Sequence, residues 1–474
     1  MGATAMTGTR ASALLLLGMI ACVLGDVVVP AEALRMGARL LLVAYLAAEW
    51  RKMAVNAKVM VGLAIGLTMG AAVAGTADPV KVIASSLDTG AFFATFFANQ
   101  FFLREAARTS PLVSRCSTFF VNQTPGRRYA LLTVGGYLFG IILNIGVLSL
   151  LGIMIKHRNS LEAAGGNEQI RDIRERRMVM ALLRGFSITP LASPLSISLA
   201  VMLTALPSLH WSSMLPLGMA TGAMILGLGW LQDRIQAPAH LRHLVPPTEP
   251  TRDLAALGGV AGLVLLVFLM ALVFEWLLGV PLSRAMLVST PLVGLGWLAS
   301  QYLEGGIASG SAAVAHRVVT QAANTFPAYR TEIAILSSAG FIGTLFSAMI
   351  PPETLGALIA SPLLPPVILP ALAILAVVAP ALIGINPIVS VTIIASALRA
   401  APGLPLSTES LALGLISGWC LAINSSAMTA SAMLLGELVG KPAKTIVLGW
   451  NGLFTLAAFA VLTGWLTILS RLTQ

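Results

Sequence analysis

The sequence predicts an all-α polytopic membrane protein with two inverted-topology repeats, each made of a re-entrant hairpin and a discontinuous helix. Three observations lead to this fold class. Charged residues are scarce, and apolar runs long enough to cross a bilayer recur from end to end. In addition, one spacing of hydroxyl side chains occurs twice inside such runs, in SPLSIS at 193–198 and in SAMTAS at 426–431.

The composition of the chain is that of a protein embedded in lipid. Of its 474 residues, 57% are hydrophobic and 10% are charged, whereas a soluble domain carries about 25% charged residues. The net charge is +10, but the basic residues stand in short connectors, where Lys and Arg mark the cytoplasmic side of a membrane protein. No stretch is polar and basic enough for a nucleic-acid-binding domain. We therefore expect the lipid bilayer, and no nucleic acid, as a partner.

Apolar segments and basic connectors divide the chain into four parts. They are N-terminal scaffold helices (1–128), a first hairpin with an interrupted helix (129–206), connecting and scaffold helices around a cytoplasmic loop at 232–253 (207–330), and a second half (331–474). Within the second half we expect a hairpin at 380–398 and an interrupted helix at 410–438.

The apolar segment 129–155 has basic residues on both sides. Arg128 precedes it, and Lys156 and Arg158 follow it, so the positive-inside rule places both ends in the cytoplasm. A re-entrant hairpin with a bend near Asn144 satisfies that placement, whereas a single long tilted helix, the alternative, does not. Non-helical backbone at membrane depth occurs only where protein or a water-filled cavity surrounds it. The tip of such a hairpin is therefore expected near a site.

The segment 380–398 offers the matching bend in the second half. Asn386 is followed by Pro387, which lacks a backbone N–H and disfavours helical backbone at the residue before it. We therefore align Asn386 with Asn144 as the tip of a second hairpin.

The two hydroxyl patterns are related by a shift of 233 positions. The residues matched by this shift are Ser193 with Ser426, Ser196 with Thr429, and Ser198 with Ser431. In the first segment, Pro190 and Pro194 each remove a backbone donor, and in the second the polar run of Asn424 and Ser425 leads into the pattern. Both patterns therefore predict an interruption in a membrane helix.

Flanking charges give the two interrupted helices opposite directions. Arg174 and Arg177 precede the first, so it begins in the cytoplasm, and Lys441 and Lys444 follow the second, so it ends there. Opposite directions define an inverted-topology repeat, whose interface near mid-membrane binds substrate and coupling ions in many secondary transporters.

We expect the hairpin bends and the helix breaks to form one binding site. A helix that stops and restarts presents N–H groups to an anion and freed carbonyls to Na⁺. Hydroxyl and amide side chains complete such a site without the burial of full charges. The candidate binding residues are Asn144, Ser149, Ser193, Ser196, Ser198, Asn386, Ser390, Asn424, Ser425, Ser426 and Thr429. Beyond a Na⁺ ion at the breaks, no metal and no cofactor is expected. For either hydroxyl cluster alone, packing between helices is the competing interpretation.

Three charged residues lie close to apolar segments. Asp88 is interpreted as a helix cap, with a proton carrier as the alternative. For Arg184 we expect snorkelling to the cytoplasmic surface, with an anion contact as the alternative. Glu275 is placed at a membrane interface beside Trp276, with an intramembrane acid as the alternative.

An enzyme needs a catalytic constellation, and the sequence contains no GxSxG, HExxH or Walker-type motif, so we do not expect an enzyme. A membrane-embedded enzyme acting on a lipid-linked substrate stays as an alternative. It would need titratable residues gathered at one membrane face, such as Asp26, Glu32 or Glu49. A second alternative is a non-transporting membrane subunit, which would not need two polar breaks at mid-depth.

With two hairpins and two interrupted helices, the chain resembles the ion transporter superfamily, and especially its divalent-anion/sodium symporter group. LREAARTSPLV (103–113) and NQTPGRRYALLT (122–133) look like segments of a bacterial family of undefined role. The resemblance implies an elevator-type secondary transporter in the bacterial inner membrane, with a transport domain that moves against a scaffold homodimer. It also implies a small-molecule anion as substrate and hairpin tips and helix breaks as binding sites.

The Ser-Asn-Thr triplet of that group is missing, and Asn424-Ser425-Ser426 is the nearest sequence. The substrate class therefore stays open. The coupling ion is Na⁺ or H⁺, and we favour Na⁺ because no Asp or Glu lies within the expected bends or breaks.

Overall fold

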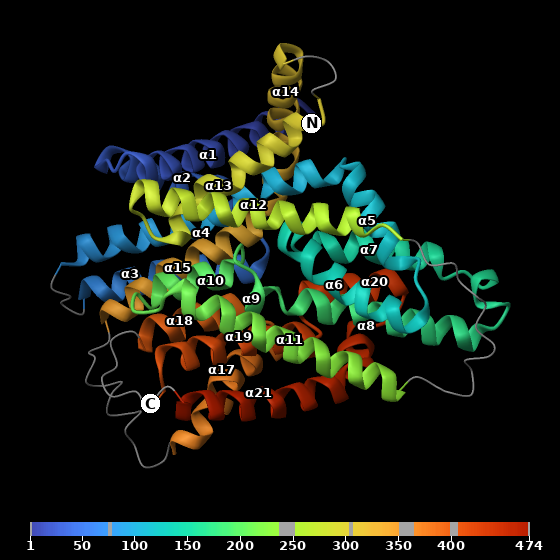
Figure 1. Cartoon of the computed structure of the whole chain (residues 1–474). Helices are drawn as coiled ribbons and strands as arrows, with labels where there is room; N and C mark the ends of the chain where they lie inside the picture. Colours follow the sequence, from blue (N-terminus) through green and yellow to red (C-terminus); the bar gives the residue numbers. More distant parts are fainter. Residues whose placement is uncertain are drawn as a thin grey trace.

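The computed structural model describes residues 2–73, 78–236, 252–302, 307–349, 365–398 and 406–472, and the regular elements in these ranges are all helices (Figure 1). Within them, nine helical stretches are long and apolar enough to cross a membrane, by length and composition. The prediction of an all-α polytopic membrane protein is therefore confirmed. Most of the expected cytoplasmic loop at 232–253 lies outside the described residues.

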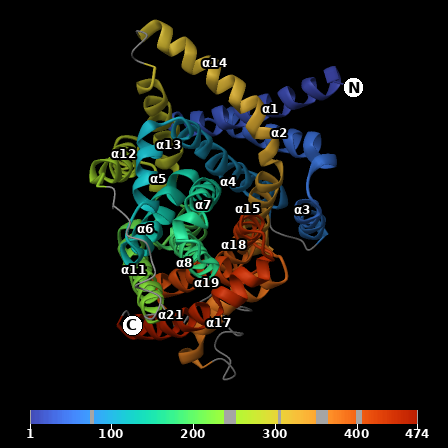
Figure 2. The ribbon, with the colours of Figure 1, turned by 90° about the vertical axis from the view of Figure 1, so that its right-hand side faces the viewer.

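Several helices of the described chain lie outside the two repeats. They are α1 (Gly2–Val28), α2 (Glu32–Glu49), α3 (Val55–Val73), α4 (Pro79–Arg108), α5 (Pro111–Val121), α11 (Trp211–Gln236), α12 (Leu254–Leu278), α13 (Leu282–Ser300), α14 (Ile307–Thr325), α15 (Arg330–Met349) and α21 (Gly452–Leu472). In both views α1, α2, α12, α13 and α14 gather on one side, whereas α11 and α21 lie at the opposite edge with the second repeat (Figures 1 and 2). The long helices α4 and α15 pack against each other.

The first hairpin consists of α6 (Pro125–Leu143) and α7 (Gly146–Arg158). The chain reverses at Asn144, whose φ of 52° makes it the one non-glycine residue with positive φ in the described ranges. Arg128, near the start of α6, borders a small pocket together with Arg174, and Asn159, just after α7, donates to the carbonyl of Arg171 at 2.9 Å. Both ends of the hairpin therefore lie beside the start of the next helix, so the tilted-helix alternative is wrong.

The first interrupted helix consists of α8 (Glu168–Ser187), the short α9 (Thr189–Ala192) and α10 (Ile197–Ala205). Residues 193–196, which we name the first break, leave helical geometry, with Ser193 extended at φ −99° and ψ 126°. The hairpin reaches this break, because the Tyr137 hydroxyl on α6 donates to the carbonyl of Ala192 at 2.7 Å.

The second repeat has the same parts. Its hairpin consists of α17 (Leu369–Leu382) and α18 (Pro387–Leu398), and its interrupted helix of α19 (Thr408–Ser425) and α20 (Ala430–Val439) around the second break, residues 426–429. The expected hairpin range of 380–398 was too short at its start. Pro380 lies inside α17, and the chain reverses at Gly384, whose φ is 97°, two residues before the expected bend at Asn386.

The two interrupted helices run in opposite directions. In the first half of α8, Arg176 donates to the carbonyl of Trp450, which lies in the turn that follows α20. At the other end, Ser208, just after α10, lies 3.5 Å from Thr408, the first residue of α19. The start of each interrupted helix therefore lies beside the end of the other, which is the inverted arrangement that the flanking charges predicted.

Residues that are equivalent between the repeats meet where the two helices cross. The Cys420 thiol on α19 lies 3.7 Å from the Ser187 hydroxyl on α8, and these residues are 233 positions apart. Two glycines matched by the same shift lie close by. A Cβ on Gly185 would stand 2.0 Å from the carbonyl oxygen of Thr133 on α6, and a Cβ on Gly418 would stand 2.6 Å from that of Ile374 on α17. In each repeat, glycine lets the first arm of the hairpin approach the interrupted helix.

Asp88 does not cap a helix, contrary to our interpretation. Asp78 is the N-cap of α4 and accepts from the N–H of Lys81 at 3.1 Å. Asp88 lies within α4, where its carboxylate forms a two-bond ion pair with Arg39 of α2 at 2.7 and 2.8 Å. It therefore links two scaffold helices.

The close approach at Gly185 leads to a stability prediction. Gly185→Ala should lower the free energy of unfolding by about 1–3 kcal/mol or more, because the new methyl group collides with a backbone oxygen that cannot move without shifting α6. Gly418→Ala should lower the free energy of unfolding by a smaller amount. Gly464→Ala on α21 is the control. A Cβ at this position would have no atom outside its own helix within 4 Å, so the variant should be neutral or slightly stabilising. Thermal unfolding in detergent measures all three, and equal stability of the Gly185 and Gly464 variants would contradict the packing.

Candidate functional site

The first break is built by its own hydroxyl groups. Ser193 Oγ accepts from the N–H two residues further on at 3.2 Å. Ser196 Oγ donates to the carbonyl of Ser193 at 2.8 Å and accepts from the N–H three residues further on at 3.3 Å, as the N-cap of α10. Ser198 Oγ donates at 2.6 Å to the carbonyl of Pro190 on the other side of the break.

The second break repeats this pattern almost bond for bond. Ser426 Oγ accepts from the N–H two residues further on at 3.1 Å, and Thr429 Oγ1 donates to the carbonyl of Ser426 at 2.8 Å. Thr429 is the N-cap of α20 and accepts from the N–H three residues further on at 3.4 Å. The hydroxyl of Ser431 donates to Thr429 at 3.2 Å. In addition, Ser426 Oγ donates to the carbonyl of Ala381 on the hairpin at 2.6 Å.

These bonds give the repeated hydroxyl spacing a physical cause. The first hydroxyl turns the chain out of the helix, the second caps the restarted helix, and the third holds the second or the chain upstream. The first and third hydroxyls are buried in both breaks, whereas Ser196 and Thr429 are half-buried. The first N–H groups of α10 and α20 have no partner within their own helices. Each break therefore presents backbone N–H groups next to a half-buried residue with a hydroxyl group, Ser196 or Thr429.

The hairpin tips are held in different ways. Asn144 donates to Oε1 of Gln100 on α4 at 3.3 Å, and Arg104 donates to the same oxygen at 3.2 Å. Gln100 and Leu195 of the first break line one small pocket, so the first tip, α4 and the first break are neighbours. Asn386 is exposed, and its side chain accepts from the N–H of Ile388 at 3.1 Å.

The remaining hydroxyl candidates lie on regular helices. Ser149 is half-buried on α7, and Ser390 is buried on α18. The Ser425 hydroxyl donates to the carbonyl of Leu421 at 2.7 Å within α19. No contact described here brings Asn144 and Asn386 together, and the convergence of all candidates on one ligand stays a prediction.

Asn424, two residues before the second break, belongs to a buried network that the sequence did not reveal. The Asn451 amide donates to the side-chain oxygen of Asn424 at 2.9 Å and to its carbonyl at 3.1 Å. Asn451 follows a turn of π-helix (η7, Thr445–Trp450) and is fully buried. Its own side-chain oxygen accepts from Arg184 Nε at 2.8 Å. Arg184 of the first repeat thus reaches the second break through one amide.

Arg184 does not snorkel to the surface, contrary to expectation. Its side chain is 3% exposed. The guanidinium donates to the Tyr129 hydroxyl at 2.9 Å and lies 4.1 Å from the ring centroid of Phe454. Its described partners are amide, hydroxyl, carbonyl and aromatic groups, without a carboxylate among them. This network joins α6, α8, α11 and α21, because the Gly229 carbonyl of α11 accepts from Arg184 at 3.3 Å.

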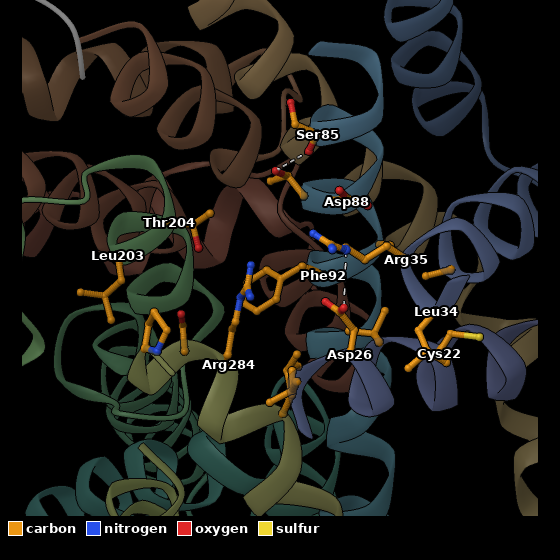
Figure 3. A pocket seen from close by; sticks show the side chains of 18 residues that line it. Cys22, Asp26, Leu34, Arg35, Ser85, Asp88, Phe92, Leu203, Thr204 and Arg284 are labelled. Atoms are coloured by element: carbon orange, nitrogen blue, oxygen red, sulfur yellow. Dashed lines mark hydrogen bonds and ion pairs between the residues drawn. The ribbon is translucent and has the colours of Figure 1, made fainter. Parts of the chain in front are cut away.

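A cavity of about 570 Å³ lies between the scaffold and the first repeat (Figure 3). Its walls come from α1, α2, α4 and α13 on the scaffold side and from Leu203 and Thr204 of α10 on the repeat side. Asp26, Arg35, Asp88 and Arg284 line it, and none of the candidate binding residues does. The charged side chains thus all come from the scaffold.

These charges are only partly neutralised. Glu32 lies 3.1 Å from Arg35 and 2.7 Å from Arg39, and Arg35 lies 3.5 Å from Asp26. Arg284, on the first turn of α13, is exposed toward the cavity and has no ion-pair partner in the part of the chain that the structure describes. The sequence did not single it out, because an Arg at the start of a membrane helix is an ordinary interfacial residue.

No protein-family model matches the chain, and a search of curated proteins found no relative. The fold is that of a solved transporter. The crystal structure of the Alcanivorax borkumensis YdaH transporter, described as having an unusual topology, superposes with a TM-score of 0.56. The match covers 88% of this chain and 98% of that one at 14% sequence identity. The chain is therefore a multi-pass membrane protein with the fold of a membrane transporter.

The Arg184 network predicts that two substitutions of Asn451 will differ. Asn451→Ala should lower the free energy of unfolding by roughly 2–3 kcal/mol, because it leaves the Nε–H of a buried guanidinium without its acceptor. Asn451→Asp keeps that acceptor and should be more stable than the Ala variant. Both remove the amide that donates to Asn424, so both should raise hydrogen exchange at 424–428. Thermal unfolding and exchange mass spectrometry check this, with exposed Asn56→Ala as the control. Equal stability of the two Asn451 variants would refute the role given to Arg184.

Proposed function

We propose that the protein is a secondary active transporter that moves a small anion across the bacterial inner membrane, coupled to Na⁺. One observation carries the proposal. Two antiparallel membrane helices are each interrupted, closely matching hydrogen bonds hold the two breaks, and the helices touch at equivalent positions. A helix interruption at membrane depth has a cost in backbone hydrogen bonds. Its repetition in opposite orientations is the arrangement on which alternating access by inverted repeats depends.

The anion would bind at the restarted helices. The N-termini of α10 and α20 direct N–H groups and the positive ends of their dipoles toward the breaks. Neither break contains a carboxylate that would repel an anion. Arg284 adds a cation without an ion-pair partner among the described residues, and it lines the same cavity of about 570 Å³ as Thr204 of α10. That cavity would serve as the path between solution and the first repeat.

Na⁺ would bind at the oxygens of the breaks. Ser196 and Thr429 are half-buried, and each lies beside backbone that has left the helix. Hydroxyl and carbonyl oxygens are hard ligands suited to a small cation, whereas proton coupling usually needs a carboxylate or His at depth. Glu275, an acid that the sequence left open, accepts from the indole N–H of Trp211 at 3.2 Å and neighbours the exposed Trp276, which fits the membrane interface better.

We further propose an elevator-type movement in which the repeats move against a homodimeric scaffold. The scaffold helices α1, α2 and α4 are joined by the ion pairs around Arg35 and Arg39, and α10 faces them across the cavity. A boundary with a cavity along it can slide more easily than a fully packed one.

The competing enzyme requires free titratable groups at one membrane face, and the pairing of these groups argues against it. Asp26 and Glu32 do lie close together, but each is within 3.5 Å of an arginine. Glu49, at the far end of α2, is 1% exposed and lies 2.8 Å from Arg330. Carboxylates in such pairs suit structural links better than acid–base catalysis.

The cation site predicts a Na⁺-dependent stability that needs no knowledge of the substrate. NaCl should raise the unfolding temperature more than choline chloride at equal ionic strength, because Na⁺ binds the folded state alone. Ser196→Ala and Thr429→Ala should each remove that difference, besides losing about 0.5–2 kcal/mol of helix capping. Ser300→Ala, an exposed hydroxyl on α13, is the control. A full Na⁺ effect in both break variants would place the cation elsewhere.

Reconstituted vesicles test the transport and its coupling. A thermal-shift panel of organic and inorganic anions, with and without Na⁺, first identifies a substrate. We then expect an inward Na⁺ gradient to drive its accumulation. Uptake driven by a pH gradient alone, unchanged when choline replaces Na⁺, would refute Na⁺ coupling, and an absence of uptake for every stabilising anion would refute the transporter.

A further inference from the structure

An apolar groove lies on the outside of the scaffold, away from both breaks. It has a volume of about 430 Å³ and lies between α2, α3, α4 and α15. It is lined by Leu46 of α2, Trp50 just after α2, Val61 and Ile65 of α3, and Phe341 of α15. Ile65 is 56% exposed and Trp50 39%, so the groove is open to the surface of the protein.

Basic side chains stand at one end of this groove. Arg51 follows Trp50 in the short helix η1 (Trp50–Lys52), and Lys58 lies one turn before Val61 on the same face of α3. Lys58 Nζ donates to the backbone carbonyl of Arg51 at 3.3 Å, which places the Lys58 ammonium beside the backbone of Arg51. Throughout the described ranges, no carboxylate lies within ion-pair distance of either. Lys52 has only a long contact of 3.8 Å with Glu49.

The combination of an apolar groove and an uncompensated basic end identifies the occupant. An acyl chain would fill the apolar groove, and a phosphate would neutralise the charges of Arg51 and Lys58. Trp50 between them has the amphipathic character of residues at the level of lipid headgroups. Basic pockets between membrane helices on the cytoplasmic side bind anionic lipid headgroups, and the charge bias assigns this end to the cytoplasm.

A second copy of the chain fits the same groove less well. In a twofold dimer within a membrane, the same ends of both copies lie at the same face and the interface pairs each patch with itself. Arg51 and Lys58 would then face their own counterparts, which brings like charges together.

We propose that the groove between α2 and α3 is a binding site for one anionic phospholipid, with an acyl chain along Leu46, Val61 and Ile65 and the headgroup phosphate on Arg51 and Lys58. The site is separate from the helix breaks and does not depend on the proposed transport. Because the lipid bridges α2, α3 and α15, its binding stabilises the scaffold in proportion to its concentration.

The experiment compares phosphatidylglycerol with zwitterionic phosphatidylcholine on the purified full chain in detergent. Native mass spectrometry counts bound lipids and protein copies, and thermal unfolding follows stabilisation. The wild type should bind phosphatidylglycerol in preference. The double variant Arg51→Gln with Lys58→Gln should weaken that binding about 30-fold, since each basic residue near the membrane surface strengthens the binding of an anionic lipid by about 5-fold.

The matched control removes the same charge elsewhere. Lys156→Gln with Arg158→Gln changes two exposed basic residues at the end of α7 and should bind phosphatidylglycerol like the wild type. Equal losses in both double variants would mean a general response to net charge, and unchanged binding in the Arg51 and Lys58 variant would remove the headgroup site. Either result overturns the proposal.

A second variant fills the groove and leaves its charges alone. Ala64→Phe on α3 places a ring in the space for the acyl chain, since Ala64 lines the groove, and should weaken the binding of both lipids. If Ala64→Phe instead converts a dimer to a monomer while phosphatidylglycerol affinity stays at the wild-type value, the groove is an interface between copies and the proposal is wrong.

Discussion

A helix that stops inside a membrane must give its freed backbone groups other partners, because lipid supplies none. This constraint accounts for the arrangement of both repeats. At each break a hydroxyl turns the chain, a second caps the helix that follows, and a third secures the local geometry. The hairpins add further bonds, since Tyr137 donates to the last carbonyl before the first break and Ser426 donates to a carbonyl near the tip of the second hairpin. The hairpin and the broken helix of a repeat are therefore one hydrogen-bonded unit.

The two breaks reach the same geometry from different sequences. The first contains Pro194 and is preceded by Pro190, and neither proline can donate a backbone N–H to the helix, so they interrupt it without help. The second has no proline, and its interruption is supported from outside, by the Asn451 amide on the carbonyl of Asn424. Arg184 holds Asn451 in turn, whereas its equivalent in the second repeat is the buried Ser417. The symmetry of the repeats is thus incomplete, and the first repeat carries a cation that supports the second.

Local patterns in the sequence were enough to predict the breaks, the first hairpin and the opposite directions of the two helices. Each of these rests on residues within a few turns of one another or on flanking charge, which is information that periodicity carries. The Arg184 network joins residues 267 positions apart, and no spacing rule identifies such partners. The position of Arg184 one turn into an apolar segment favours snorkelling, whereas in the fold Phe454 and Asn451 cover it from α21 and the turn before it. The ion pair of Asp88 with Arg39 joins residues 49 positions apart, so no spacing rule predicts it either.

The distribution of charge suggests how one part of the protein could move against another. The scaffold is joined by ion pairs, including Arg39 with Asp88 and Arg35 with Asp26, and these line the cavity that faces α10. At their breaks the repeats carry hydroxyls and amides, which cost far less to shift between polar and apolar surroundings than ions do. Arg184 is the exception, but its partners Tyr129 and Asn451 belong to the first hairpin and to the turn before α21. In the proposed movement the cation would travel with its partners as one body, so its hydrogen bonds would persist while the surface that slides past the scaffold stays free of charge.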